Sequence, residues 1–218
     1  MSGELRNWIV ISVVGVIWLT LVLVGLVAGD LHQLSVIADL VPLLLIAAAL
    51  FERWGWRWKR LHPYLVQMPV VRGTWRGELE SLWEDPETKT RPAKKVVYLA
   101  IEQTLTESVA RLMSNESSSD QLVGVIRRRP GGRFFLSAIY QNTPLIDRRE
   151  ASPIHFGAMT LDIYGHPPSR LEGEYWTERP SKGKLVLSGH SLRLAESYED
   201  AHKLDFPHEA PSPANPTD

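Results

Sequence analysis

Two patterns of hydrophobic residues divide the chain. Residues 8–28 carry no charged side chain, and residues 34–51 form a second, mostly apolar stretch. As a helix the first stretch would extend about 30 Å, which matches the hydrocarbon core of a membrane. From residue 73 onward, apolar and polar side chains alternate in short runs, as they do in β-strands. The sequence predicts a membrane-anchored all-β protein, with two N-terminal transmembrane helices in residues 1–60 and a β domain in residues 61–195.

The residues around the second apolar stretch predict its orientation. Residues 52–60 (ERWGWRWKR) interleave tryptophans with basic side chains, whereas residues 28–33 (AGDLHQ) contain no Lys or Arg. Tryptophan prefers the membrane interface, and basic residues stay on the cytoplasmic side. We therefore expect both termini and the β domain in the cytoplasm.

A cleaved signal peptide is the competing interpretation, which the second apolar stretch disfavours. Asp39 is either a functional acid within the bilayer or a residue at its far interface, and we favour the second.

Turn residues separate eight strand-like runs in the β domain. These runs cover residues 73–83, 95–103, 105–114, 121–128, 133–142, 155–164, 170–179 and 183–193. An even number of closely spaced antiparallel strands favours a compact, eight-stranded, up-and-down β-barrel, because closure removes the exposed edges. An open sheet or a sandwich is the alternative.

The seventh run shows where a ligand could bind. Its outward row is Glu172, Glu174, Trp176 and Glu178, and its inward row is Leu171, Gly173, Tyr175, Thr177 and Arg179. Successive side chains of a strand point to opposite faces. The inward row thus starts apolar and becomes polar as it approaches a Pro-Ser-Lys-Gly turn. This change predicts that the row leaves the packed core and enters the mouth of a pocket.

In an up-and-down barrel the odd-numbered strands all end at one rim, distal to the membrane linker. The candidate ligand-binding residues at this rim are Trp83, Tyr140, Asn142, His155, Tyr175, Thr177 and Arg179, with Lys94, Lys182 and Lys184 nearby. Guanidinium suits phosphate, aromatic faces suit bases, and amide or hydroxyl groups suit base edges, so a nucleotide would fit. The alternative is that rims are always polar and that Tyr and Trp are simply good strand formers.

Several kinds of chemistry lack a motif in the sequence. The chain has no cysteine, no Gly-rich phosphate loop opens a helix, and no histidines or carboxylates stand at a metal-ligand spacing. We expect no enzyme activity, no metal, no cofactor, and no DNA or RNA polymer as a partner.

The RRRPGGR turn at 127–133 should lie at the membrane-proximal end, facing anionic headgroups. Residues 196–218 are acidic and Pro-rich, which predicts a disordered tail.

The order of several sequence blocks resembles one known family. Two closely spaced apolar stretches and a basic, Trp-rich junction precede the blocks GTWRGELES, IEQTLTESVARLMSNESSSD, YQNTPL, IHFGAMTLDI and LEGEYWTERPSKGKLVL. This order is similar to that of the two-transmembrane, β-rich effectors of bacterial CBASS anti-phage systems, the CD-NTase-associated protein 15 family. The similarity covers about residues 8–190.

The resemblance implies a cytosolic barrel that binds a cyclic di- or trinucleotide made by a partner CD-NTase. Binding would drive self-association into a homo-oligomer in the phospholipid bilayer of the bacterial inner membrane, disrupt that membrane and kill the infected cell. The alternative is a constitutive membrane-anchored barrel that binds a lipid or a protein partner without any nucleotide. An enzyme acting on a lipid or a nucleotide is a third possibility.

Overall fold

The computed structural model describes residues 18–20, 23, 43–62, 64–150 and 152–206. The chain separates into two compact units, residues 1–58 and residues 59–218.

In the first unit, residues 43–53 are helical and are followed by a 3-10 turn, η1 (Gly55–Arg57). Trp56 is buried, whereas Trp54 and Trp58 are exposed. Within the described part of the chain, no helix has both the length and the apolar character needed to span a bilayer. Most of the first expected span and residues 34–42 of the second, Asp39 included, lie outside the described residues. Both membrane spans therefore stay predictions.

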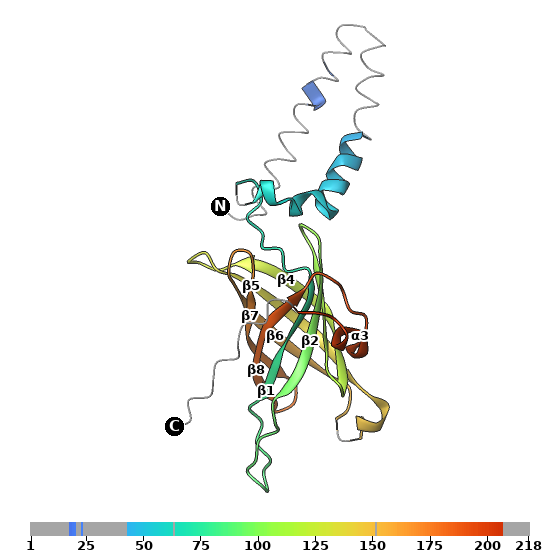
Figure 1. Cartoon of the computed structure of the whole chain (residues 1–218), viewed down its shortest axis with the longest axis vertical. Coiled ribbons are helices and arrows are strands. Elements are labelled where there is room, and N and C mark those ends of the chain that lie inside the picture. The colour runs from blue at the N-terminus through green and yellow to red at the C-terminus, as the bar shows by residue number, and fades with distance from the viewer. Residues whose placement is uncertain (1–17, 21–22, 24–42, 63, 151, 207–218) are drawn as a thin grey trace. The chain divides into compact units, whose positions relative to one another are not determined.

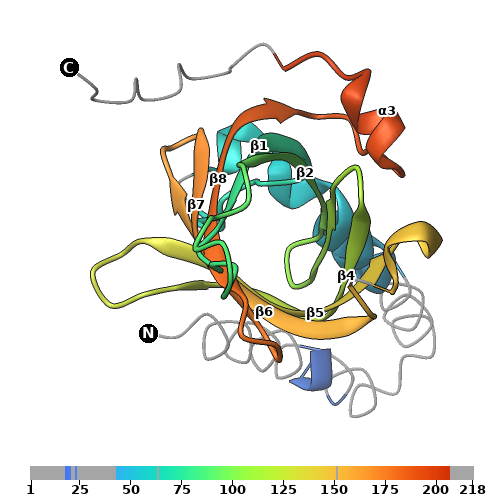
Figure 2. The same cartoon turned by 90° about the horizontal axis from the view of Figure 1, so that it is seen from below.

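The second unit contains a closed, eight-stranded, antiparallel barrel in which each strand pairs with its neighbours in sequence. The strands are β1 (Gly73–Ser81), β2 (Lys95–Gln103), β3 (Ser108–Met113), β4 (Ser117–Arg128), β5 (Phe134–Pro144), β6 (His155–Tyr164), β7 (Arg170–Thr177) and β8 (Lys182–Ser191). Figure 1 shows the barrel from its side, and Figure 2 shows the strands forming a ring. The predicted up-and-down barrel is confirmed, and the open sheet and the sandwich are not formed.

The side-chain alternation read from the sequence matches the inside and outside of the barrel. In β7, Leu171 and Tyr175 are buried, while Glu174 and Trp176 are exposed. The interior contains large, fully buried apolar side chains from six of the eight strands, among them Trp75, Leu99, Leu136, Leu161, Leu171, Leu185 and Leu187. This packing fills the middle of the barrel, as expected for eight strands.

The segment that leads into β1 packs into one end of the barrel. Val66 and Val71 are buried, and Gln103 at the end of β2 holds the segment at two points. The Val71 amide donates to Gln103 Oε1 at 2.8 Å, and Gln103 Nε2 donates to the Pro69 carbonyl at 2.9 Å. Two 3-10 turns, η2 (Lys59–Leu61) and η3 (Ile146–Arg148), lie outside the strands. The sequence indicated only a short linker before the first strand, but the last part of this segment closes the proximal end of the barrel.

The C-terminal part of the described chain covers the outside of β1 and β2. Helix α3 (Tyr198–His202) begins at the N-cap Ser197, whose side chain accepts from the Asp200 amide at 3.1 Å. Ala201 is fully buried and belongs to a cluster with Tyr98 and Ala100 on the outer face of β2. The predicted disorder is therefore wrong for residues 196–206, because β2 is apolar on both faces and needs this cover. The remaining tail, residues 207–218, lies outside the described residues.

Candidate ligand-binding site

A cavity of about 230 Å³ opens at the distal end of the barrel. It is formed where the odd-numbered strands end and the even-numbered strands begin, which is the rim that the sequence indicated. Its apolar lining includes Leu79, Val97, Leu112, Met159 and Leu185, and its polar lining includes Ser81, Ser114, Ser117, Ser119, Asn142, Ser152, Thr177 and Ser181. Since the proximal end is packed by residues 66–71, a ligand would enter from the distal side.

Five of the seven candidate residues line this cavity. They are Tyr140, Asn142, His155, Tyr175 and Thr177. Trp83 and Arg179 are not among the lining residues, and the Trp83 side chain is 37% exposed. Their contact with a ligand stays a prediction.

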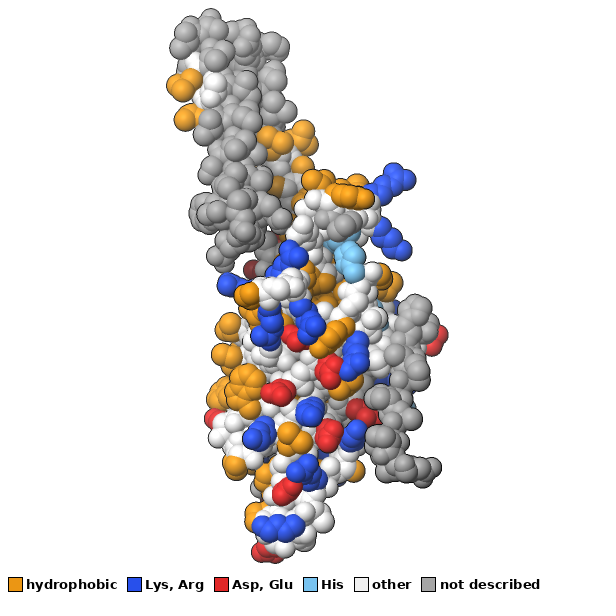
Figure 3. Space-filling model, turned by 90° about the vertical axis from the view of Figure 1, so that its left-hand side faces the viewer, with side chains coloured by type: hydrophobic (Ala, Val, Ile, Leu, Met, Phe, Trp, Pro, Cys, Tyr) orange, Lys and Arg blue, Asp and Glu red, His pale blue; other side chains and the backbone are white. Residues whose placement is uncertain are grey.

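The additional lysines nominated at the rim point to the outside of the barrel. Lys94 Nζ lies 3.7 Å from a carboxylate oxygen of Glu80 and 3.8 Å from one of Glu78. Lys182 and Lys184 are exposed and occupy the outward row of β8. Lys184 lies opposite Glu80 and Glu174 in the strand register. Figure 3 shows both signs of charge interspersed over one face of the molecule.

The cavity wall is built from two pairs of tyrosine and glycine on adjacent strands. Tyr140 lies opposite Gly157 in the β5–β6 register, and Tyr175 lies opposite Gly183 in the β7–β8 register. A Cβ atom added to Gly157 would lie 2.5 Å from the Tyr140 hydroxyl oxygen, and one added to Gly183 would lie 2.6 Å from Tyr175 Cε1. The glycines therefore leave the space that the two aromatic rings occupy.

Burial keeps both phenols uncharged. Loss of hydration raises the pKa of Tyr140, and the nearby Tyr175 raises it further. Burial also raises the pKa of Tyr175, and hydrogen bonds with the side chains of Ser81 and Ser181 partly oppose this rise. At neutral pH the wall thus presents aromatic surface and O–H groups rather than negative charge.

An amide and two hydroxyls form a small hydrogen-bonded cluster on β4 and β5. Asn142 Nδ2 donates to Ser119 Oγ at 2.8 Å and to Ser117 Oγ at 3.1 Å. These side chains come from the inward rows of β4 and β5, at the end of the β4–β5 pairing. All three residues line the cavity, and amide and hydroxyl groups suit the edge of a base.

Arg179 lies in the turn after β7 and contacts the loop between β5 and β6. Its Nη2 donates to Ser152 Oγ at 3.1 Å and lies 2.8 Å from His155 Nδ1. Nη2 also lies 3.2 Å from His155 Nε2. Since guanidinium can only donate, the tautomer with its proton on Nδ1 satisfies both neighbours: Nδ1–H donates to the Pro153 carbonyl at 2.9 Å, and Nε2 accepts from Arg179. Within the described residues Arg179 Nε is buried without a hydrogen-bond partner.

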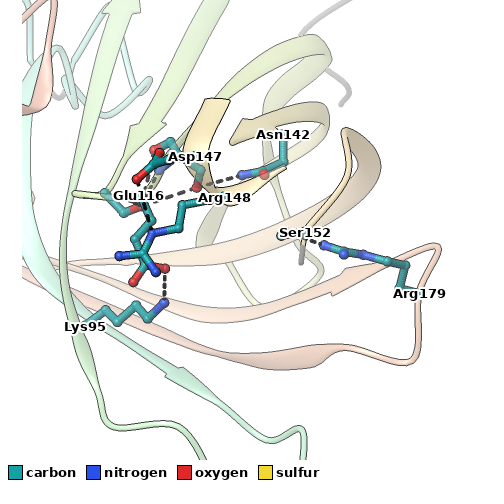
Figure 4. A network of polar contacts seen from close by, with 9 residues as sticks. Lys95, Glu116, Asn142, Asp147, Arg148, Ser152 and Arg179 are labelled. Carbon is teal, nitrogen blue, oxygen red and sulfur yellow. Dashed lines mark hydrogen bonds and ion pairs between the residues drawn. The ribbon is translucent and has the colours of Figure 1, made fainter. Parts of the chain in front are cut away.

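An ion pair at the mouth was not predicted from the sequence. Lys95, the first residue of β2, pairs with Glu116 in the hairpin between β3 and β4, and both line the cavity. Figure 4 shows this pair near Asn142 and the Asp147–Arg148 pair. The polar run 114–119 (SNESSS) between two strands was the available signal, because every second residue of a strand that reaches the rim points inward.

Comparison with known proteins identifies the matching family. The family model for the Cap15 cyclic dinucleotide receptor domain matches residues 66–188. No curated protein matches the chain. The matched range begins at the segment that closes the proximal end, includes every residue that lines the distal cavity, and ends before α3.

Proposed function

The chain belongs to the Cap15 cyclic dinucleotide receptor family, and we propose that the distal cavity of its barrel is the site that binds the cyclic dinucleotide. The observation that carries this proposal is the lining of the cavity. Uncharged tyrosines, a serine–asparagine cluster and a basic side chain at the mouth surround one opening, inside the matched range. These groups suit the base, the base edge and the phosphate of a nucleotide.

The volume of the cavity favours insertion of one half of the ligand. A cavity of 150 Å³ is known to hold a benzene ring, so about 230 Å³ is suited to one base with part of its sugar. The charged lining residues Lys95 and Glu116 lie at the mouth, whereas the deeper lining is apolar or uncharged. We therefore place one base inside the barrel and the phosphodiester groups at the mouth.

Ligand class is tested by thermal unfolding of the full chain in detergent. A ligand that binds only the folded state at about 100 times its Kd stabilises by about 2.7 kcal/mol, which corresponds to a rise of about 5–10 °C. We expect such a rise with at least one of cyclic di-AMP, cyclic di-GMP, cyclic GMP–AMP and cyclic di-UMP. A rise with fatty acids or phospholipids, together with no response to any cyclic nucleotide, would support the lipid-binding alternative instead.

We further propose that the protein is a CBASS effector. In this proposal residues 1–60 anchor it in the bacterial inner membrane, the barrel is cytoplasmic, and a partner CD-NTase supplies the ligand. Ligand binding then drives self-association, which disrupts the membrane and kills the infected cell. No covalent chemistry is needed, since a ligand that binds the associated form more tightly shifts the population toward it.

The outer face of the barrel offers a surface for this self-association. Val123, Ile139, Ala158 and Trp176 are directly paired across four neighbouring strands. Val123 is 67%, Ile139 52% and Trp176 49% exposed. A contiguous exposed apolar row of this kind is typical of association surfaces. Beyond Asp120, where the β3–β4 pairing ends, the Gln121 side chain accepts from the Ala110 amide at 3.1 Å and donates to the Ser108 carbonyl at 2.6 Å, so it covers the edge of β3.

A charged substitution in this row should prevent association but not ligand binding. We expect Ile139→Lys to reduce ligand-dependent chemical cross-linking of the full chain several-fold, because a lysine ammonium would be desolvated in the interface. Ser137→Lys is the matched control, because Ser137 is on the same outward face of β5 but outside the apolar row. Equal cross-linking by both variants and the parent protein would exclude this surface.

A further inference from the structure

The charges of the cavity lining cancel each other. Among the described residues that line the cavity, Lys95 is the basic one and Glu116 the acidic one. Their side chains form an ion pair and are 40% and 35% exposed, so both are reachable from the mouth. The ammonium group closest to an incoming phosphodiester is therefore already bound to a carboxylate.

The backbone on either side of this pair is held in place. Lys95 is paired with Leu79 in the β1–β2 ladder. The Glu116 amide donates to Ser114 Oγ at 3.2 Å, and the Glu116 carbonyl accepts from the Leu145 amide at 2.9 Å. The hairpin tip is thus tied both to itself and to the loop that follows β5. A change at this point would involve rotation of the Glu116 side chain rather than movement of the hairpin.

A cyclic dinucleotide would compete with Glu116. It carries two phosphodiester charges, and a phosphate brought to Lys95 would approach a carboxylate of the same sign. Lys95 can make a full charge-assisted hydrogen bond to phosphate only if the carboxylate moves away. The repulsion by the Glu116 carboxylate and the need to displace it both lower the affinity of the site for an anion.

We propose that Glu116 is an internal competitor of the ligand, occupying Lys95 until a phosphodiester group displaces it. This inference rests on the proposed function and adds a specificity-determining residue to it. The ion pair weakens binding to a level at which only abundant ligand, or ligand with strong additional base contacts, opens the site. Weakly held phosphate-bearing metabolites are rejected by the same contact.

The test is titration calorimetry of the full chain in detergent with the same four cyclic dinucleotides. We expect Glu116→Gln to bind the recognised cyclic dinucleotide about three- to tenfold more tightly, since an exposed ion pair is weak and its loss frees Lys95. Lys95→Gln should bind several-fold more weakly. In the Lys95→Gln background the gain from Glu116→Gln should shrink, because the two substitutions act on one contact.

Glu84→Gln is the matched control. Glu84 pairs with Arg91 at 2.6 Å in the loop between β1 and β2 at the same end of the barrel, but does not line the cavity. Glu84→Gln removes the same charge as Glu116→Gln. Unchanged ligand affinity in Glu84→Gln would therefore show that the gain in Glu116→Gln comes from freeing Lys95 and not from the change in net charge. Binding by the parent protein with no gain, or a loss, in Glu116→Gln would overturn this inference and leave the proposed function standing. Absence of binding by the parent protein and all variants would overturn both.

Discussion

Tyr140 and Tyr175 were predicted from the sequence as ligand-binding residues, and both lie in the wall of the cavity. Alternation assigned Tyr175 to an inward row, and the up-and-down strand order assigned Tyr140 to the distal rim. Each ring has room because its cross-strand neighbour is a glycine. The burial that makes these rings part of the wall also keeps them protonated, which has a measurable consequence at alkaline pH.

We expect the stability that Tyr140 contributes to be present below about pH 10 and to be lost as the pH rises further. An unfolded tyrosine ionises near 10.0, whereas burial raises the pKa of Tyr140 in the folded chain. Between the two pKa values the unfolded state binds fewer protons, so the free energy of unfolding falls by about 1.4 kcal/mol per pH unit.

The free energy of unfolding should therefore fall less steeply above pH 10 in Tyr140→Phe than in the parent protein. Denaturant unfolding between pH 8 and 11.5 measures both curves, and the comparison cancels the other groups that titrate in this range. Parallel curves would show that Tyr140 ionises as readily in the folded as in the unfolded chain.

At Arg179 the strand alternation read from the sequence no longer applies. Alternation placed it in the inward row of the seventh strand, but β7 ends at Thr177. The Thr177 amide donates to the Ser181 carbonyl at 3.0 Å and closes a turn, so side-chain alternation no longer applies at residue 179. The guanidinium then lies against Ser152 and His155 beside the cavity. Glu178, which the sequence placed in the outward row, accepts from the Phe156 amide at 3.1 Å.

At the scale of elements, alternation predicted the eight strands but not all of their limits. The expected third and fourth strands were 105–114 and 121–128, whereas β3 begins at Ser108 and β4 at Ser117. Residues 117–120 are polar, and local propensity therefore assigned them to a turn. Pairing with β5 extends the strand through them, because Ser117 lies opposite Pro144 and Ser119 opposite Asn142. Part of the cavity's hydroxyl lining consequently escaped prediction.

The C-terminal segment was missed for a related reason. Its composition is polar and acidic, and its few apolar residues are spaced too irregularly to indicate an element. The signal lay in β2, where residues 96–101 (VVYLAI) are apolar without alternation. A strand of that kind is buried on both faces. Tyr98 accordingly packs against Tyr198 and Phe206, with ring centroids 5.4 Å and 5.8 Å away.

At the scale of the barrel, the two ends have different roles. The proximal end is packed by the segment that includes Val66 and Val71, while the distal end opens into the cavity. A barrel of eight strands is mostly filled by its own side chains, so a ligand site has to lie at an end rather than along the axis. This asymmetry could be predicted from the polar ends of the inward rows, but the closing segment could not, because its contacts with Gln103 are non-local.

The central claim is that the cyclic dinucleotide binds inside the distal mouth. Ser81 and Glu80 are the last two residues of β1; Ser81 lines the cavity, and Glu80 contacts Lys94 on the outside. A tryptophan at position 81 would occupy the space assigned to the base, whereas one at position 80 would lie on the outer surface.

Titration calorimetry of the full chain with the recognised cyclic dinucleotide tests this claim most directly, with thermal unfolding as the check that each variant is folded. The account predicts that Ser81→Trp lowers affinity at least about a hundredfold, a loss of about 2.7 kcal/mol, while Glu80→Trp binds like the parent protein. Unchanged affinity in a folded Ser81→Trp barrel would contradict it and would place the ligand outside the cavity.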